Sequence, residues 1–81
     1  MEIQLNNAAI KQFKRLNEPY RSRIAATIDK LAQNPLTGNI KKMQEKDGYR
    51  ISVGDYRILF DILDDKIIIF KIAPRGQVYK E

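Results

Sequence analysis

The alternation of apolar and polar residues through residues 49–73 constrains the fold more than any other feature of this 81-residue chain. The segments YRISV, YRILFDIL and IIIFKIA are rich in β-branched and aromatic residues, and short polar stretches separate them. Between the first two segments, Gly54 and Asp55 favour a two-residue type II′ turn. Such a turn pairs Val53 with Tyr56. The sequence therefore predicts an antiparallel meander whose first hairpin has a defined register.

The register of the second hairpin can be predicted from burial. A two-residue loop at Asp64 and Asp65 would place Lys71 on the apolar face, where an unpaired lysine is costly. A three-residue loop that also includes Lys66 pairs apolar residues with one another instead. We therefore expect the three-residue loop, with the core-facing pairs Ile62 and Ile68, Phe60 and Phe70, and Ile58 and Ile72.

The first half of the chain predicts one short strand and a first helix. EIQL alternates weakly, as is typical of an edge strand, and ends at Asn6. Either Asn6 or Asn7 can cap a helix that runs to about Leu16. Ile10 and Phe13 precede Leu16 at helical spacing, so these side chains are expected to share one face.

A second helix and a further strand complete the predicted elements. Pro19 suits a first helical turn, and QNPLTG ends the helix. Ile24, Ile28 and Leu31 form its apolar stripe, and IKKM is a candidate strand. The predicted fold class is α+β: an N-terminal strand and a two-helix hairpin packed on a mostly antiparallel sheet of about four to five strands. One domain over residues 1–81 is expected.

The composition excludes several kinds of chemistry. The chain has no cysteine and no histidine, so disulfides, thiolate metal sites and an imidazole base are excluded. Any acid–base catalysis must use Tyr, Lys, Arg, Asp or Glu. The adjacent Asp64 and Asp65 side chains diverge and have no histidine beside them. We therefore expect no metal site and no cofactor.

Charge and hydropathy predict the partners in broad terms. The formal charge of +5 favours an anionic partner such as nucleic acid or an acidic protein. No N-terminal stretch has the pattern of a secretion signal, and no apolar run is long enough to span a membrane. We therefore expect a cytoplasmic protein without a membrane partner.

The predicted register gathers basic residues on the face of the meander opposite the helices. Arg50 and Arg57 lie on this face, and Lys71 joins them from the last strand. Arg75 follows if that strand continues. The expected floor of the face is partly apolar and consists of Leu59, Ile69 and Ala73.

Residues near the ends of the meander could extend this basic face. Pro74 and Gly76 are expected to bend the chain, so that Tyr79 turns back towards the arginines. On the candidate strand IKKM, Lys41 and Lys42 could enlarge the basic surface. These side chains are therefore candidates for contact with an anionic ligand.

Two interpretations of the basic face are open. An ordinary solvated sheet face also carries polar residues in alternation. Such a face usually mixes charges of both signs, whereas Asp61 is the acid expected here. Arginines favour phosphate binding, because the guanidinium fork matches two phosphate oxygens and stays charged. Tyr79 could likewise pack on the sheet edge, stack on a base or give up its proton.

The segment GYRISVGDYRILFDILDDKIIIFKIAPRGQVY resembles the RelE side of the RelE/ParE superfamily, the toxins of bacterial and archaeal toxin–antitoxin modules. The resemblance covers nearly the whole chain, and residues 54–60 and 75–79 carry its most specific parts. It implies a type II toxin that enters the ribosomal A site, cleaves mRNA there and inhibits translation. The implied reaction is metal-independent attack of the ribose 2′-hydroxyl on the scissile phosphate.

The resemblance implies a catalytic set of four residues. Arg57 and Arg75 match arginines that would stabilise charge in the transition state. Tyr79 matches the family's terminal tyrosine, as a general base or as a ring that stacks on a base. Arg50 stands at a position that is often lysine, and its role would be electrostatic because a guanidinium stays protonated.

One departure from the family pattern keeps other functions open. Ser52 stands where RelE toxins commonly have a second lysine. Lys41, Lys42 or Lys71 could substitute, and these lysines and Ser52 are the expected RNA-binding residues. The alternatives are a ParE-like DNA gyrase inhibitor and a catalytically inactive homologue that binds an antitoxin.

The resemblance also implies a set of partners. These are the ribosome and its mRNA, and a cognate antitoxin that is acidic and partly disordered. Operator DNA would be reached indirectly, through the antitoxin.

Overall fold

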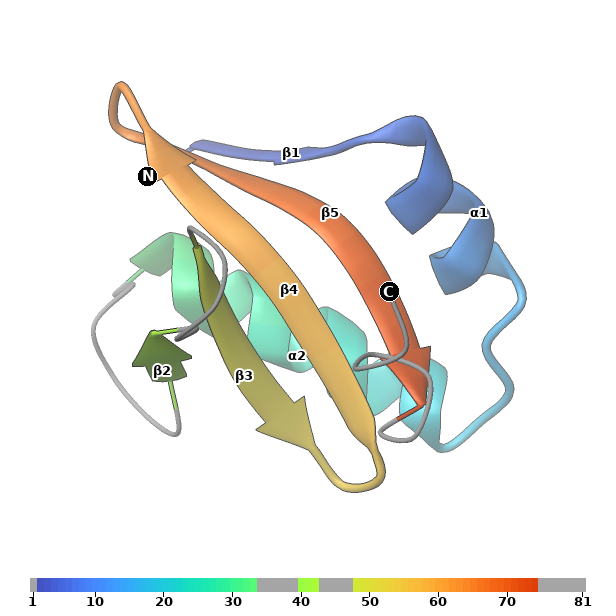
Figure 1. Ribbon diagram of the computed structural model, residues 1–81. Coiled ribbons are helices and arrows are strands. Elements are labelled where there is room, and N and C mark those ends of the chain that lie inside the picture. The colour runs from blue at the N-terminus through green and yellow to red at the C-terminus, as the bar shows by residue number, and fades with distance from the viewer. Residues whose placement is uncertain (1, 34–39, 43–47, 75–81) are drawn as a thin grey trace.

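The computed structural model describes residues 2–33, 40–42 and 48–74 (Figure 1). The elements are β1 (Glu2–Leu5), α1 (Asn7–Lys14), α2 (Tyr20–Gln33), β2 (Ile40–Lys42), β3 (Tyr49–Val53), β4 (Tyr56–Leu63) and β5 (Lys66–Pro74). The described strands form a five-stranded sheet in the order β1-β5-β4-β3-β2. β1 is parallel to β5, and the other neighbouring pairs are antiparallel. The predicted α+β class is confirmed, and β1 is an edge strand.

Side chains cap both helices and fix the junction between them. Asn6 is the N-cap of α1, and its Oδ1 accepts a hydrogen bond from a first-turn amide at 2.8 Å. Glu18 Oε1 accepts from the Ser22 amide at 2.9 Å, which satisfies an N–H in the first turn of α2. Arg21 donates through Nε and Nη2 to the Leu16 carbonyl at 3.2 and 2.8 Å. Within the described residues, neither helix is long and apolar enough to cross a membrane.

The Glu18 cap makes a pH-dependent contribution to stability. The Ser22 hydroxyl donates to Glu18 Oε2 at 2.8 Å. This bond, together with the bond from the Ser22 amide, holds the pKa of Glu18 below its ordinary value. Because the folded-state pKa is the lower one, the contribution is present above the unfolded-state pKa and is lost as the pH falls through the folded-state pKa.

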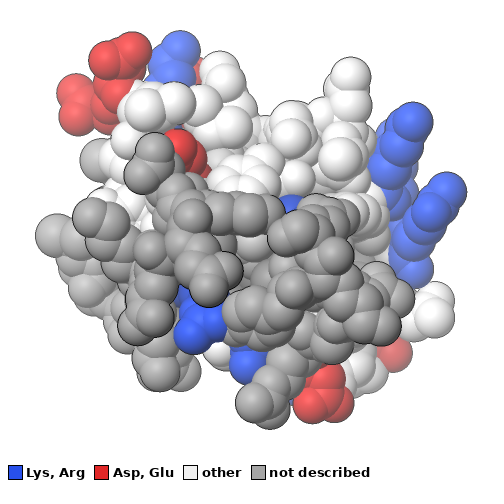
Figure 2. All heavy atoms as spheres, in the orientation of Figure 1, with Lys and Arg blue, Asp and Glu red and all other residues white. Residues whose placement is uncertain are grey.

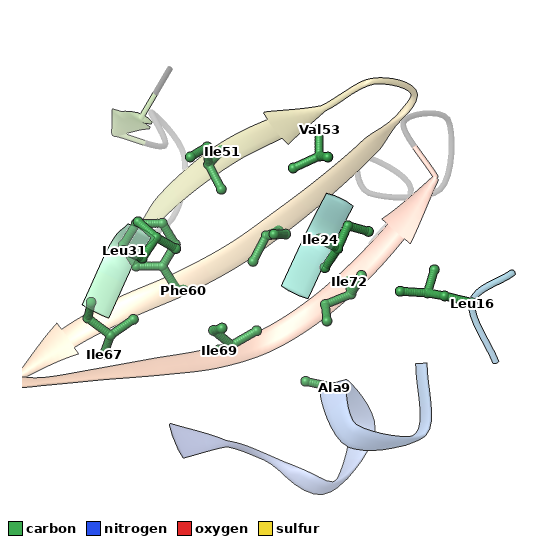
Figure 3. Packing of buried hydrophobic residues seen from close by; sticks show 11 residues of the cluster. Ala9, Leu16, Ile24, Leu31, Ile51, Val53, Phe60, Ile67, Ile69 and Ile72 are labelled. Carbon is green, nitrogen blue, oxygen red and sulfur yellow. The ribbon is translucent and has the colours of Figure 1, made fainter. Parts of the chain in front are cut away.

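One hydrophobic core lies between the helices and the sheet (Figure 3). α2 crosses the sheet behind β3 and β4, and α1 lies beside β5 (Figure 1). Phe13 and Leu16 contact this core as expected, but Ile10 is 37% exposed and Ala9 is buried instead. The buried members of the core are Ala9, Leu16, Ile24, Leu31, Ile51, Val53, Ile58, Phe60, Ile67, Ile69 and Ile72.

The first hairpin has the predicted register, whereas the loop of the second hairpin differs from the prediction. Val53 pairs with Tyr56 across the Gly54 turn. In the second hairpin, Leu63 pairs with Lys66, so the loop has two residues and the predicted three-residue loop is wrong. Both loop residues, Asp64 and Asp65, have positive φ, at 50° and 62°, as a type I′ turn requires.

A β-bulge explains how a two-residue loop avoids burying Lys71. Phe60 pairs with Ile69 but Leu59 pairs with Lys71, so Phe70 is an extra residue in β5. Before the bulge, Ile67 and Ile69 face the core. After it, Ile72 pairs with Ile58 as predicted, and Lys71 stays off the core face. The expected positions of Ile69 and Phe70 are therefore interchanged: Ile69 is in the core, and Phe70 packs on the opposite face with Leu59 and Ala73.

A glutamine continues the hydrogen bonding of β5 beyond the end of β1. The Asn6 amide donates to the Ile69 carbonyl at 3.0 Å, and the chain then turns into α1. Farther along β5, Gln12 Oε1 accepts from the Ile72 amide at 2.7 Å. Ile72 is 2% exposed, so its amide would otherwise be left without water or a partner strand. Gln12 therefore joins α1 to the sheet.

Replacing Gln12 with alanine is expected to lower the free energy of unfolding by about 1–3 kcal/mol, because a buried amide loses its acceptor. Alanine is a good helix former, so the loss cannot be assigned to helix propensity. Urea unfolding followed by circular dichroism measures the change. Lys11→Ala, on an exposed position of the same helix, is the matched control and should change stability by less than about 0.5 kcal/mol. Equal unfolding midpoints for the two variants would contradict this role of Gln12.

Candidate functional site

The candidate site is the face of β3, β4 and β5 that is turned away from the helices. In β3, Ile51 and Val53 are buried in the core, so Arg50 and Ser52 lie on the opposite face. Arg50 pairs with Leu59 of β4, and Leu59 pairs in turn with Lys71 of β5. We call this surface the basic face and define it by Arg50, Ser52, Arg57 and Lys71.

Arg50 and Arg57 are diagonal neighbours on this face. Ser52 pairs with Arg57, and Arg57 pairs with Ala73. Adjacent strands lie about 4.8 Å apart, and diagonal positions are roughly 7–8 Å apart. Side chains as long as arginine span that distance, so both guanidinium groups can reach one phosphate. Cations from three strands thus meet on one face.

The floor of the basic face is a second, smaller apolar cluster. Leu59 and Ala73 are 5% and 4% exposed, and Phe70 packs against them half-buried. Apolar surface beside a charged group lowers the local dielectric and strengthens its attraction to an anion. The floor also offers a ring and methyl groups against which a flat, apolar ligand surface can pack.

Arg57 is held by backbone carbonyls of the β3–β4 turn. Its Nη1 donates to the Tyr56 carbonyl at 3.1 Å and to the Gly54 carbonyl at 3.5 Å. A guanidinium carries one N–H on Nε and two on each Nη. Among the described residues, the Nε and Nη2 groups of Arg57 have no partner. Their two parallel N–H bonds form the edge that suits a bidentate phosphate contact.

Two acidic residues of the sheet, Asp61 and Glu2, make a backbone contact and an ion pair, respectively. Asp61 is half-buried, and its Oδ1 accepts from the Ile62 amide at 2.9 Å. The ion pair of Lys66 Nζ with Glu2 Oε2, at 3.6 Å, lies at the end of the sheet where β4 joins β5. Figure 2 looks onto the face of the sheet that is turned away from the helices. Asp and Glu atoms gather at upper left, at that end, and a few more lie at lower right. Lys and Arg atoms are visible at the right, at upper left and in the lower half.

The structure brings together part of the predicted site. Arg50, Arg57 and Lys71 are half-buried on one face, with the exposed Ser52 beside them. Lys41 pairs with Arg50 in the register of β2. Lys42 pairs with Tyr49, and Pro74 ends β5. Residues outside the described part of the chain include Arg75, Gly76 and Tyr79.

Phe70 and Ile68 are both expected on the core side, whereas the structure places Ile67 and Ile69 there and pairs Ile68 with Asp61. The signal for this difference is the break in the alternation of β5. Ile67 and Ile69 alternate as core residues, and Lys71 then stands where the next core residue would fall, with Ile72 directly after it. An extra residue before Ile72 accounts for that break, and a bulge is the usual way to insert one.

The fold and the comparison with known proteins define the class of the protein: a RelE-like toxin of the RelE/ParE superfamily. The family model described as the ParE toxin of the type II toxin–antitoxin system parDE matches residues 3–79. The chain belongs to this family and is thus a toxin of a type II toxin–antitoxin system. The comparison with curated proteins gave no match.

Solved structures show the same architecture. A chain in the RelB–RelE antitoxin–toxin complex from Methanococcus jannaschii is 30% identical, with 93% of each chain covered and a TM-score of 0.77. A chain in the archaeal RelE–RelB complex from Pyrococcus horikoshii is 24% identical, with 94% of this chain and 96% of that chain covered and a TM-score of 0.77. The isolated Escherichia coli RelE toxin is 18% identical, with 96% and 89% covered and a TM-score of 0.78. The last two likenesses concern the fold alone.

Proposed function

We propose that this toxin is an endoribonuclease that cleaves mRNA in the ribosomal A site and thereby inhibits translation. The observation that carries the proposal is the arrangement of Arg50, Arg57 and Lys71 on three adjacent strands of one face. Arg57 is the best placed of the three, because its Nε and Nη2 edge has no partner among the described residues. A face of this kind suits a dianionic phosphorane-like transition state better than it suits an apolar or cationic ligand.

The proposed reaction is an in-line displacement at phosphorus. The 2′-oxygen of the ribose forms a bond to phosphorus, and the bond from phosphorus to the 5′-oxygen of the next nucleotide breaks. The 2′-hydroxyl proton goes to a general base, and the leaving oxygen takes up a proton. The products are a 2′,3′-cyclic phosphate and a 5′-hydroxyl. Water is not consumed in this step, and the protein must supply charge stabilisation and proton transfer.

The roles divide between electrostatic and proton-transfer groups. Arg57 and Arg75 stabilise the charge that develops on the equatorial oxygens. Arg50 contributes to the same field, because a guanidinium does not release its proton near neutral pH. Tyr79 is the proposed general base or stacking ring. Lys71 is the described residue of the basic face that could give a proton to the leaving oxygen, since Ser52 carries no charge.

An antitoxin and the translating ribosome are the proposed partners. The Methanococcus, Pyrococcus and Escherichia neighbours include structures of toxin–antitoxin complexes. A net charge of +5 and a basic sheet face favour a partner that is acidic and partly disordered. Such a partner would cover the cations until it is degraded, and operator DNA would be bound through it. Ribosomal mRNA is the substrate, and the cytoplasm is accordingly the proposed location.

Inhibition of DNA gyrase is the second candidate function. The description of the matching family, a ParE toxin, favours it. The neutral Ser52 on the basic face also weakens the case for proton transfer there. A homologue that only binds its antitoxin is the remaining alternative. These functions make different demands: gyrase inhibition requires no phosphate site, whereas RNA cleavage requires one.

Cleavage mapping on programmed ribosomes tests the proposal. The purified toxin is added to 70S ribosomes that carry a defined mRNA, and primer extension locates the new ends. We expect cuts within the A-site codon, a 2′,3′-cyclic phosphate on the upstream fragment and little cleavage of the same mRNA without ribosomes. A gyrase supercoiling assay runs in parallel. Inhibition of supercoiling with intact mRNA would overturn the proposal in favour of the second function, and inactivity in both assays would favour the antitoxin-binding homologue.

A further inference from the structure

Two tyrosines connect the β3–β4 turn with the beginning of α2: Tyr56 is the first residue of β4, and Tyr20 is the first residue of α2. The ring centroids of Tyr20 and Tyr56 lie 4.7 Å apart with an interplanar angle of 47°. The Arg23 guanidinium lies 5.7 Å from the Tyr20 centroid, within cation–π range. Tyr20 Oη also donates to Asp55 Oδ2 at 3.5 Å. We call Tyr20 and Tyr56 the tyrosine clamp. Figure 1 shows the turn and the start of α2 at the same end of the molecule.

Gly54 brings the turn into close contact with this clamp. Its φ is +60°, a conformation that favours glycine. A Cβ at this position would lie 3.1 Å from Tyr20 Cε1, which is tighter than ordinary van der Waals contact. The backbone of the turn therefore packs directly on the Tyr20 ring, and the position of the ring sets the position of the turn.

The same turn sets the orientation of Arg57. Arg57 Nη1 donates to two carbonyls at the turn, those of Tyr56 and Gly54. One of these carbonyls belongs to a clamp residue, and the other belongs to the glycine that contacts the ring. A displaced turn would therefore rotate the guanidinium and redirect its Nε and Nη2 edge.

The other end of this chain of contacts is fixed as well. Glu18 caps the first turn of α2 by accepting a hydrogen bond from the Ser22 amide. Arg21, in the same helical turn, donates to the Leu16 carbonyl. Farther along α2, Ile24 is fully buried in the core. These contacts hold the first turn of α2, and therefore Tyr20, in a defined position.

We propose that Tyr20 and Tyr56 are positioning residues that hold the Arg57 guanidinium with its Nε and Nη2 edge presented to the scissile phosphate. This inference rests on the proposed ribonuclease function. Arg57 then enters the reaction with its orientation already set, so little rotamer freedom has to be lost in the transition state. Neither tyrosine touches the substrate, and both act through Arg57.

Cleavage kinetics on programmed ribosomes test the positioning role, with Tyr20→Leu as the main variant. Misplacement of a reacting group by about 1 Å can cost on the order of 100-fold in rate. We expect Tyr20→Leu to lower the rate constant at saturating ribosome concentration by about 10- to 100-fold. The half-saturating concentration should change little, because the charge of the basic face is intact. Tyr20→Phe keeps the ring and should stay within about 3-fold of wild type, since it loses only the 3.5 Å hydroxyl contact.

A double-variant comparison separates positioning from general destabilisation. If the clamp acts through Arg57, Tyr20→Leu combined with Arg57→Ala should be no slower than Arg57→Ala alone. Phe13→Leu removes a partly buried ring from the same core, away from the turn, and should leave the rate constant unchanged. Gly54→Ala disturbs the turn from the other side and should reproduce the loss seen with Tyr20→Leu. Circular dichroism verifies that each variant is folded at the assay temperature.

The outcomes distinguish this inference from the function on which it rests. An active wild type with an equally active Tyr20→Leu would overturn the positioning role alone. Additive losses in the double variant would overturn it too, because the tyrosine would then act independently of Arg57. A wild type that cuts no mRNA on ribosomes would overturn the proposed function and the positioning role together. If Tyr20→Leu does not fold, the Gly54→Ala rate constant decides between the same outcomes.

Discussion

Replacing Arg57 with alanine is expected to slow cleavage of A-site mRNA by about 100- to 1,000-fold, the usual cost of removing one preorganised donor from a developing oxyanion. The loss should fall on the rate constant at saturation. Arg57 donates to the Tyr56 and Gly54 carbonyls at 3.1 and 3.5 Å, so the fold itself orients its guanidinium. Single-turnover cleavage of a labelled mRNA on 70S ribosomes measures the effect. Arg75→Ala and Tyr79→Ala are also expected to lower the cleavage rate constant.

A charge-matched variant separates this effect from loss of overall positive charge. Arg15→Ala removes the same charge from an exposed position after α1. Its rate constant should equal that of wild type. Arg57→Lys keeps the charge but loses the Nε and Nη2 edge, and should recover only part of the lost rate. Equal rate constants for Arg57→Ala and Arg15→Ala would show that the basic face does not carry out the chemistry.

The part of the fold that could be predicted is the part with strong local signals. Gly54 and Asp55 specify a tight turn, and the register of β3 and β4 follows from it residue by residue. Asn6 caps α1, and the stripe of Ile24 and Leu31 is buried. The basic face could be predicted for the same reason, because alternation from a known turn assigns Arg50 and Arg57 to one side.

The second hairpin shows where assigning the register residue by residue from a predicted turn fails. The burial argument was right that Lys71 stays off the core face, but a longer loop and a bulge both achieve this. The alternation of IIIFKIA allows either solution, and the difference depends on packing between strands and on a turn with two positive φ angles at Asp64 and Asp65. The interchange of Ile69 and Phe70 follows directly from choosing the loop.

Contacts between distant elements were the other part that the sequence did not reveal. The bond from the Ile72 amide to Gln12 joins residues that are 60 positions apart, and no local pattern marks Gln12 as different from other polar helix residues. The same is true of the contact of Tyr20 with Gly54, which requires the helix and the turn to be placed in space first. Alternation assigns residues to faces, whereas tertiary packing decides which of them meet.

Replacing Phe60 with alanine is expected to have the largest effect on stability. Phe60 is fully buried, stacks on Tyr49 at 5.6 Å between ring centroids and pairs with Ile69 beside the bulge. Removing a ring from such a site costs about 3–5 kcal/mol. A domain of this size has roughly 4–12 kcal/mol of stability in total, so most of it could be lost. Urea unfolding of the purified variant measures the change.

Phe70→Ala is the matched comparison, and it tests the bulge itself. With a three-residue loop and no bulge, Phe60 and Phe70 would pair on the core face, and the two alanine variants would lose similar stability. With the bulge, Phe70 is half-buried in the small cluster of Leu59 and Ala73. Its loss should then cost only about 1–2 kcal/mol, because less apolar area returns to water. A cost equal to that of Phe60→Ala would contradict the bulged register and return Phe70 to the core side of the sheet.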